Sequence, residues 1–258
     1  FGSASSSLAE GTNKMNLLAK KIRNFFRIIK KPFIKKKDFW KNNIPEIDEE
    51  NKNLIEFIGE YSLTPLIRRW TLIKSLHYIN KKKVIGDIVE CGIWRGGNLF
   101  LAKKIQDKYY KEIKRKLYGF DTFEGMPEPS IHDGVKVNKT YQNFKNKNEP
   151  WTKASLDDVK NFSKKLFSDI DEFNFIKGKV EDTLPGVVPE KIALLRLDTD
   201  WYESTKQEMI HLFPRLVPGG VLIIDDYGVW KGCQKAVDEY FSERKIKIFL
   251  SRIDFSSR

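Results

Sequence analysis

The chain has 258 residues and a mass of 30.2 kDa, enough for one α/β domain preceded by an N-terminal extension. With 40% hydrophobic and 13% aromatic residues it can form a substantial core, yet no apolar run approaches the ~20 residues of a membrane-spanning helix. The two cysteines, Cys91 and Cys233, exclude a disulfide framework and lack metal-binding spacing, which suits the reducing cytoplasm.

The net charge of +12 is concentrated in one segment. Residues 15–42 contain ten Lys or Arg against Asp38 alone, a net +9, so the rest of the chain carries only +3. Apolar residues recur at helical spacing in this segment: Leu18, Ile22, Phe25, Phe26 and Ile29. A basic amphipathic helix suits peripheral contact with an anionic membrane, a partner, its own domain or a second subunit of a homo-oligomer. Nucleic acid is a weaker expectation because no recognised binding motif accompanies the charge.

Composition divides the chain into three parts. Residues 1–14 resemble an artificial leader ahead of a native start at Met15, residues 15–52 form the basic arm, and residues 53–258 form the main domain. Within the main domain, residues 122–172 are expected to form an insertion that contacts substrate or acts as a lid, because binding residues concentrate in such connections.

Strand-like and helix-like segments alternate along the main domain. Two helices meeting near Thr64 and Pro65 are followed by six predicted strands, at residues 87–91, 117–121, 173–178, 193–198, 221–226 and 245–250. Residues 122–153 are expected to be irregular, and Ser155 with Asp158 predicts a capping box that starts the next helix. The alternation predicts a doubly wound, mostly parallel α/β sheet.

Four aspartates follow two of these strands. Asp198 and Asp200 come after ALLRL, and Asp225 and Asp226 come after VLII. Ligands bind at the carboxyl ends of strands in open parallel sheets, and like charges gathered there repel unless a cation or a shared proton compensates them. The pattern favours a divalent Mg²⁺-like ion with oxygen ligands, although each pair alone could cap a loop or helix.

A glycine-rich turn follows the first predicted strand. Trp94 stands where a dinucleotide fingerprint needs its second glycine, so its bulk disfavours NAD. Glu90, before the turn, suits an amino-bearing ligand, and Asp121, at the end of the next strand, can accept both ribose hydroxyls. Together these residues predict S-adenosylmethionine; the alternative is a tight connection that needs small residues.

Five segments together resemble the macrocin/mycinamicin sugar O-methyltransferase family: DIVECGIWRGGN, YGFDTFEGMPEP, KGKVEDTLP, LLRLDTDWYEST and PGGVLIIDDYGVWKGCQKAVDEYF. The resemblance covers roughly residues 60–245, in the family's order. It implies a class I, Rossmann-like methyltransferase with a seven-stranded type of sheet and an N-terminal helical extension. Such an enzyme uses S-adenosylmethionine and a divalent cation to methylate a sugar hydroxyl.

The resemblance also implies roles for individual residues. The cofactor-binding residues would be Glu90, Gly92, Trp94, Gly97, Asn98, Asp121, Thr122, Glu181 and Asp182. Of these, Glu90, Gly92 and Gly97 would flank the methionine moiety, Asp121 would take the ribose, and Glu181 with Asp182 would border the adenine. The metal ligands would be Asp198, Asp225 and Asp226. Apart from the resemblance, Asp200 is a candidate either for the general base or for a residue that supports the metal ligands, although Asp198 could both bind the metal and act as the base.

Three other functions stay open from the sequence. They are an NAD-type oxidoreductase on a similar sheet, a non-catalytic scaffold that uses the basic arm, and a methyltransferase for a catechol-like small molecule. The fold usually ends with a further antiparallel strand, and residues 252–258 either supply part of it or the chain stops before it.

Overall fold

The structure is a computed structural model that describes residue 40, residues 42–147 and residues 151–258. It divides into two units, Phe1–Asp48 and Glu49–Arg258. The amphipathic helix expected in the basic arm lies outside the described residues, so its membrane contact and a homo-oligomer stay predictions. Among the described helices, none is long and apolar enough to cross a membrane.

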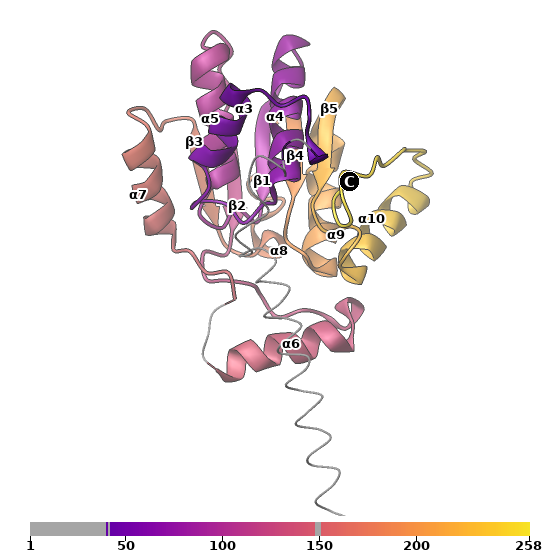
Figure 1. Cartoon of the computed structure of the whole chain (residues 1–258). Coiled ribbons are helices and arrows are strands. Elements are labelled where there is room, and N and C mark those ends of the chain that lie inside the picture. Colours follow the sequence, from indigo (N-terminus) through magenta and orange to yellow (C-terminus); the bar gives the residue numbers. More distant parts are fainter. Residues whose placement is uncertain (1–39, 41, 148–150) are drawn as a thin grey trace, which may run out of the picture. The chain divides into compact units, whose positions relative to one another are not determined.

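The larger unit is built on a five-stranded parallel sheet with the order β3-β2-β1-β4-β5 (Figure 1). The strands are β1 (Asp87–Cys91), β2 (Leu117–Asp121), β3 (Phe173–Lys177), β4 (Ile192–Leu197) and β5 (Leu216–Ile224). The order reverses between β1 and β4, which is the point where open α/β sheets bind ligands. The doubly wound α/β class is therefore confirmed.

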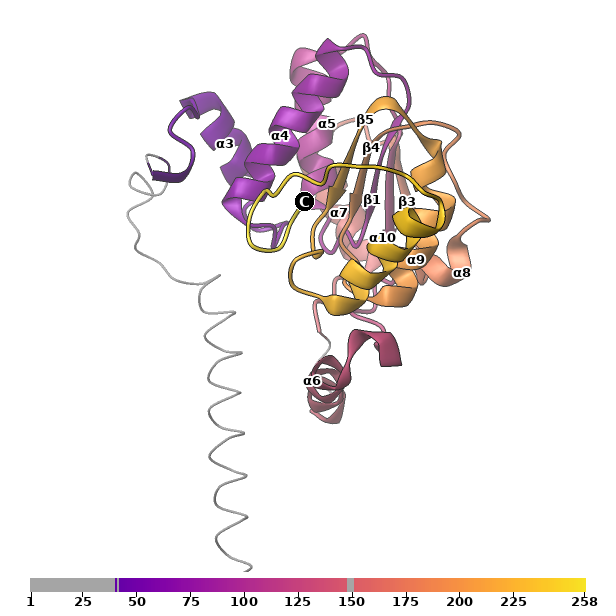
Figure 2. The same cartoon turned by 90° about the vertical axis from the view of Figure 1, so that its right-hand side faces the viewer.

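Helices cover both faces of the sheet, with α4 and α5 on one face and α9 and α10 on the other (Figure 2). In chain order the helices are α3 (Glu49–Phe57), α4 (Leu66–Lys81), α5 (Gly97–Tyr109), α6 (Val135–Asn146), α7 (Leu156–Leu166), α8 (Val180–Thr183), α9 (Tyr202–His211) and α10 (Lys231–Glu243), with 3₁₀ turns η1 (Ile131–Asp133) and η2 (Phe213–Arg215). This double cover explains why β4 is buried at every position.

Local signals placed several helix ends correctly. Pro65 stands at the N-cap of α4, as the predicted break between two helices requires. Ser155 and Asp158 form the predicted capping box of α7. The fifth strand, in contrast, begins earlier than predicted, because the Pro218–Gly220 segment lies inside β5, where the pairing with β4 shifts register.

The prediction that residues 122–153 are irregular was wrong, because they contain η1 and α6. Helix α6 lies beyond the edge of the sheet where the strands end (Figures 1 and 2). None of its residues is buried. The helix was missed because its polar sequence, VKVNKTYQNFKN, has only a sparse apolar face.

The sixth predicted strand, residues 245–250, does not form in the structure. Its apolar residues point largely to solvent, and Phe249 is 89% exposed. The end of the chain lies beside β5 instead, where Arg258 and Ile224 exchange two backbone hydrogen bonds of 2.9 Å. Apolar alternation predicts a strand only when a neighbouring strand supplies hydrogen bonds, and here that neighbour is missing for 245–250.

Candidate functional site

Strand register brings the acidic strand ends side by side. Cys91 of β1 pairs with Leu197 of β4, which in turn pairs with Ile224 of β5. The backbone amides of Asp198 and Asp225 donate to the carbonyls of Cys91 and Leu197, at 2.9 Å each. Three neighbouring strands therefore deliver their next residues to the same level of the switch point.

Asp198, Asp200 and Asp226 form an acidic cluster at this level. One carboxylate oxygen from each lies within 4.8 Å of the others. Burial, reinforced by the neighbouring negative charges, raises the pKa of Asp198 and Asp226 well above the ordinary range, and burial raises the pKa of Asp200 to about 7. Oδ2 of Asp226 is buried and receives no hydrogen bond from a described donor. Within the cluster only Asp198 has a cationic partner among the described residues, Arg196 at 2.7 Å, and the carboxylate oxygens are of the kind that a Mg²⁺-like cation binds.

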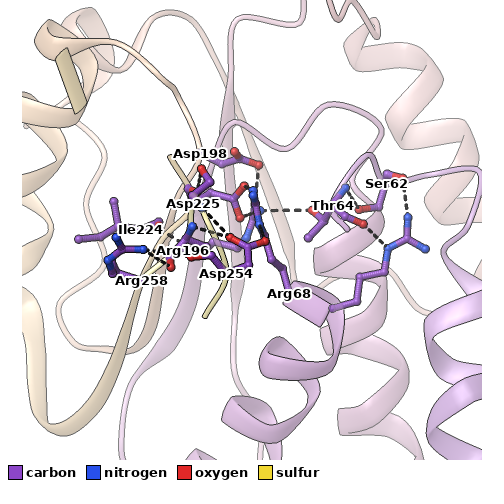
Figure 3. Close-up of polar contacts among 12 residues, drawn as sticks. Ser62, Thr64, Arg68, Arg196, Asp198, Ile224, Asp225, Asp254 and Arg258 are labelled. Carbon is purple, nitrogen blue, oxygen red and sulfur yellow. Dashed lines mark hydrogen bonds and ion pairs between the residues drawn. The ribbon is translucent and has the colours of Figure 1, made fainter. Parts of the chain in front are cut away.

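Asp225, expected as a metal ligand, does not join this cluster. Its Oδ1 accepts from Nη2 of Arg196 and its Oδ2 accepts from Nη1 of Arg68 (Figure 3). A carboxylate that is only 4% exposed needs paired charges, and two guanidinium groups supply them here. The acidic cluster is thus Asp198, Asp200 and Asp226 rather than the expected Asp198, Asp225 and Asp226.

Arg196 is the centre of a buried ion-pair network. Its Nη1 donates to Oε1 of Glu90 at 2.5 Å and to Oδ2 of Asp198 at 2.7 Å. Burial alone would lower the pKa of Arg196, but the surrounding carboxylates raise it well above the usual value. The sequence analysis missed this residue. Its signal was a lone arginine inside the apolar strand IALLRL, since arginines are almost never buried without a partner.

The last residues of the chain are tied into the same network. Nε of Arg68 donates to Oδ2 of Asp254 at 2.7 Å (Figure 3). The Ser256 hydroxyl donates to the carbonyl of Asp225 at 2.7 Å. Arg68 and Asp254 are 186 residues apart, so no local pattern could have found their contact. The end of the chain thereby helps to fix Asp225 at the end of β5.

Glu90 and Asn98, both expected cofactor residues, lie together on β1 and α5. Nδ2 of Asn98 donates to Oε1 of Glu90 at 2.8 Å and to the Thr64 hydroxyl at 3.0 Å, while the Ser62 hydroxyl donates to Oδ1 of Asn98 at 3.2 Å. Burial raises the pKa of Glu90. The side chain of Glu90 is therefore held in one orientation by an amide and by Arg196.

Asp121 ends β2 beside the turn that follows β1. Its Oδ2 accepts from the backbone amide of Trp94 at 2.9 Å, and its Oδ1 accepts from that of Phe123 at 2.7 Å. Burial raises the pKa of Asp121. The Thr122 hydroxyl donates to the carbonyl of Gly125 at 2.6 Å and so closes the next turn. Two turns thus converge on one carboxylate, which accepts a backbone hydrogen bond from each of them.

The expected cofactor glycines have a structural reason of their own. A Cβ on Gly92 would lie 2.0 Å from the carbonyl oxygen of Asp198, and one on Gly97 would lie 2.5 Å from that of Tyr61. Gly92 also has a φ of +83°, which favours glycine. The first contact joins the end of β1 to the end of β4, and the second joins the start of α5 to the segment between α3 and α4, so glycine is required at both positions with or without a ligand.

Glu181 and Asp182, expected beside the adenine, lie in α8, directly after β3. Glu181 is half-buried and Asp182 is exposed. Burial raises the pKa of Glu181. The two residues thus stand at the same edge of the sheet as Asp121, since Gly178 before α8 donates its amide to the carbonyl of Asp121 at 3.0 Å.

Comparisons with known proteins agree with this geometry. Residues 58–257 match the sequence model of the family described as macrocin O-methyltransferase (TylF). The chain is 36% identical over 172 residues to the 8-demethyl-8-(2,3-dimethoxy-alpha-L-rhamnosyl)-tetracenomycin-C 4'-O-methyltransferase of Streptomyces olivaceus, covering 66% of this chain and 64% of that protein. It is also 36% identical over 175 residues to the mycinamicin III 3''-O-methyltransferase of Micromonospora griseorubida, covering 66% of each.

The structural comparison points the same way. The fold is similar to that of the O-methyltransferase NovP, with a TM-score of 0.69 and 28% identity, over 76% of this chain and 80% of that one. The match to the family spans most of the chain, whereas the matches to the two relatives span about two thirds of their lengths. The chain belongs to the macrocin O-methyltransferase family.

Proposed function

We propose that this chain is an S-adenosylmethionine-dependent O-methyltransferase that methylates a sugar hydroxyl with the help of a Mg²⁺-like cation. The observation that carries the proposal is the cluster of Asp198, Asp200 and Asp226 at the switch point of the sheet, in which Asp200 and Asp226 have no cationic partner among the described residues. Support also comes from the two relatives, both named as O-methyltransferases, one on a compound that carries a rhamnosyl group.

The cofactor would lie across the carboxyl ends of β1 and β2. Glu90, whose Oε1 accepts from Asn98 and Arg196, would receive the amino group of the methionine moiety on its other carboxylate oxygen, Oε2. Asp121 would accept hydrogen bonds from the ribose hydroxyls. Glu181 and Asp182 would border the adenine.

Asp198 and Asp226 would hold the cation, which needs only one or two protein carboxylates when substrate oxygens complete its shell. A bound divalent cation lowers the pKa of a hydroxyl group that it contacts. Asp225, fixed by Arg68 and Arg196, would hold its chain neighbour Asp226 in place.

Asp200 is the best candidate for the general base. Methyl transfer forms a bond from the acceptor oxygen to the methyl carbon and breaks the carbon–sulfur bond, while the hydroxyl proton passes to a carboxylate. The pKa of Asp200, raised by burial to about 7, suits a base that works near neutral pH. Asp198 suits this role less because Arg196 already donates to its Oδ2 at 2.7 Å.

The decisive experiment measures methyl transfer from S-adenosylmethionine to a panel of nucleotide-sugars, glycosides and catechols, with Mg²⁺ and with EDTA. We expect transfer to a sugar hydroxyl that EDTA abolishes and added Mg²⁺ restores. Transfer that survives chelation would remove the cation from the proposal. Transfer to catechols alone would overturn the proposed substrate class.

A further inference from the structure

One buried carboxylate connects the segment between β2 and α7 to the candidate site. Asp133, at the end of η1, is 4% exposed. Its Oδ2 accepts from the backbone amide and the hydroxyl of Ser130, at 2.8 and 2.9 Å, and so completes the capping box of η1. Its Oδ1 accepts from the backbone amide of Tyr202 at 2.7 Å. Asp133 thereby caps α9, whose own N-cap residue, Trp201, makes no side-chain cap.

Asp133 is also wedged against the first turn of α10. A Cβ on Gly232 would lie 1.8 Å from Oδ1 of Asp133 and 2.9 Å from the backbone nitrogen of Tyr202. Gly232 has no positive φ, so space rather than backbone conformation requires glycine here. The carboxylate therefore lies between the N-terminal turns of two helices, where a negative charge is favoured.

Further contacts connect the segment between β2 and α7 to Trp201 and Tyr202. The indole Nε1 of Trp201 donates to the carbonyl of Pro127 at 3.0 Å, and the His132 and Tyr202 rings lie 4.3 Å apart between centroids. Trp151 packs edge-on against Trp201 at 5.9 Å. The segment thus holds the two residues that directly follow the candidate base.

Asp200 has a backbone conformation that needs such support. Its φ is +69°, unusual for a residue other than glycine, and the amide of Trp201 donates to the carbonyl of Thr199 at 2.8 Å around it. Strained residues persist only where their surroundings hold them. Here the surroundings include Asp133 and Pro127.

We propose that Asp133 is a positioning residue that couples residues 122–147 to the conformation of Asp200. The proposal rests on the proposed function, in which Asp200 is the general base. Asp133 touches no reacting group. It fixes the start of α9 and therefore the position of Asp200, two residues before Tyr202. On the cofactor side of the site, Asn98 and Arg196 orient Glu90 from α5 and β4.

The kinetic test compares Asp133→Ala, Asp133→Asn and the control Asp158→Ala in the full chain. Asp158 completes a matched capping box with Ser155 on α7. We expect Asp133→Ala to lower kcat and raise the acceptor KM, together by roughly 10- to 100-fold in kcat/KM, with the Kd for S-adenosylmethionine unchanged. Asp133→Asn keeps Oδ1 as an acceptor and should recover part of the loss. Asp158→Ala should leave the kinetics unchanged.

The structural test measures amide hydrogen exchange, which needs no activity. We expect faster exchange in residues 128–147 and at Tyr202 in Asp133→Ala, and no change there in Asp158→Ala. Gly232→Ala should reproduce the effect by displacing the carboxylate, and should add little to Asp133→Ala in the double variant. If Asp133→Ala does not fold, Asp133→Asn and Gly232→Ala carry the same test.

Two failures are distinguishable. Absence of methyl transfer by the unaltered enzyme would reject the proposed function. Unchanged exchange in the Asp133 and Gly232 variants, or an equal loss of kcat/KM in Asp158→Ala, would overturn the coupling.

Discussion

Two groups of carboxylates occupy neighbouring strand ends of this protein, and they differ in what neutralises them. Glu90 and Asp225 are each bound by at least one buried guanidinium group, so their charges are satisfied within the fold. Asp200 and Asp226 have no such partner among the described residues, and only Asp198 touches both groups, through Arg196. Carboxylates at the same edge of the sheet can therefore be paired within the fold or be left without a cationic partner, and the positions of the arginines decide which.

The largest effect should come from removing Arg196, the arginine that forms ion pairs with Glu90, Asp198 and Asp225. Arg196→Met leaves three carboxylates without this partner. Because breaking a buried ion pair exposes an uncompensated charge, the free energy of unfolding should fall by about 3–5 kcal/mol. Urea unfolding measures it. The control Arg244→Met, whose ion pair is exposed, should change stability by no more than about 0.5 kcal/mol. An equally small change for Arg196→Met would erase the distinction between the two groups.

Adjacent aspartates allow a direct contrast between the groups. Asp226→Asn should weaken Mg²⁺ binding by more than the roughly 10- to 100-fold expected for a residue that contacts only a metal ligand. It should not lower stability, because it removes a negative charge that the neighbouring aspartates repel. Asp225→Asn should instead lower stability and change Mg²⁺ affinity by less than about 100-fold. Calorimetric titration and urea unfolding report the two quantities. Identical profiles for the two variants would show that Asp225 belongs with the metal ligands.

The pH dependence sharpens the comparison further. Burial raises the pKa of Asp200 from 3.8 to about 7 in the folded protein. The folded state therefore binds more protons than the unfolded state between these values, and stability without a cation should fall as pH rises from about 4 to 7. Protons compete with Mg²⁺ for these carboxylates, so Mg²⁺ should raise Tm more at pH 8 than at pH 5. Equal Tm shifts at both pH values would argue against this cluster as the site.

The smallest effect on stability should come from removing Asp254, which contacts only Arg68 among the paired arginines. Asp254→Ala removes one partner of Arg68 but leaves Asp225 in place. The free energy of unfolding should fall by about 1–3 kcal/mol, as for other hydrogen bonds to charged groups. Glu243→Ala, at an exposed ion pair of 3.7 Å, should cost only about 0–1 kcal/mol. A larger loss for Glu243→Ala than for Asp254→Ala would contradict the role given to the chain's end.

Much of the fold was predictable because its signals are local. Five of the six predicted strands form, and the breaks at Pro65 and Ser155 stand where the sequence indicates them. Failures occurred where stability depends on distant neighbours. Residues 245–250 have the pattern of a strand but lack a strand to pair with, and α6 forms with no buried residue to mark it.

The candidate site divides in the same way. The acids at the ends of β4 and β5 were found because a parallel sheet places all its strand ends at one edge. Asp133 was not found, because its partner Tyr202 is 69 residues away and only packing joins them. Gly92 and Gly97 were predicted as cofactor-binding residues. In the structure they are required because neighbouring backbones approach closely at both positions.

By itself the sequence determined the parallel α/β architecture, the family and the identity of the acids at the site, since apolar periodicity and motif order are properties of neighbouring residues. Only the tertiary structure decided which acids are paired with arginine and which have no cationic partner among the described residues. Arg68 and Arg196 stand 157 and 29 residues from Asp225, and charges are paired by proximity in space, which folding alone creates.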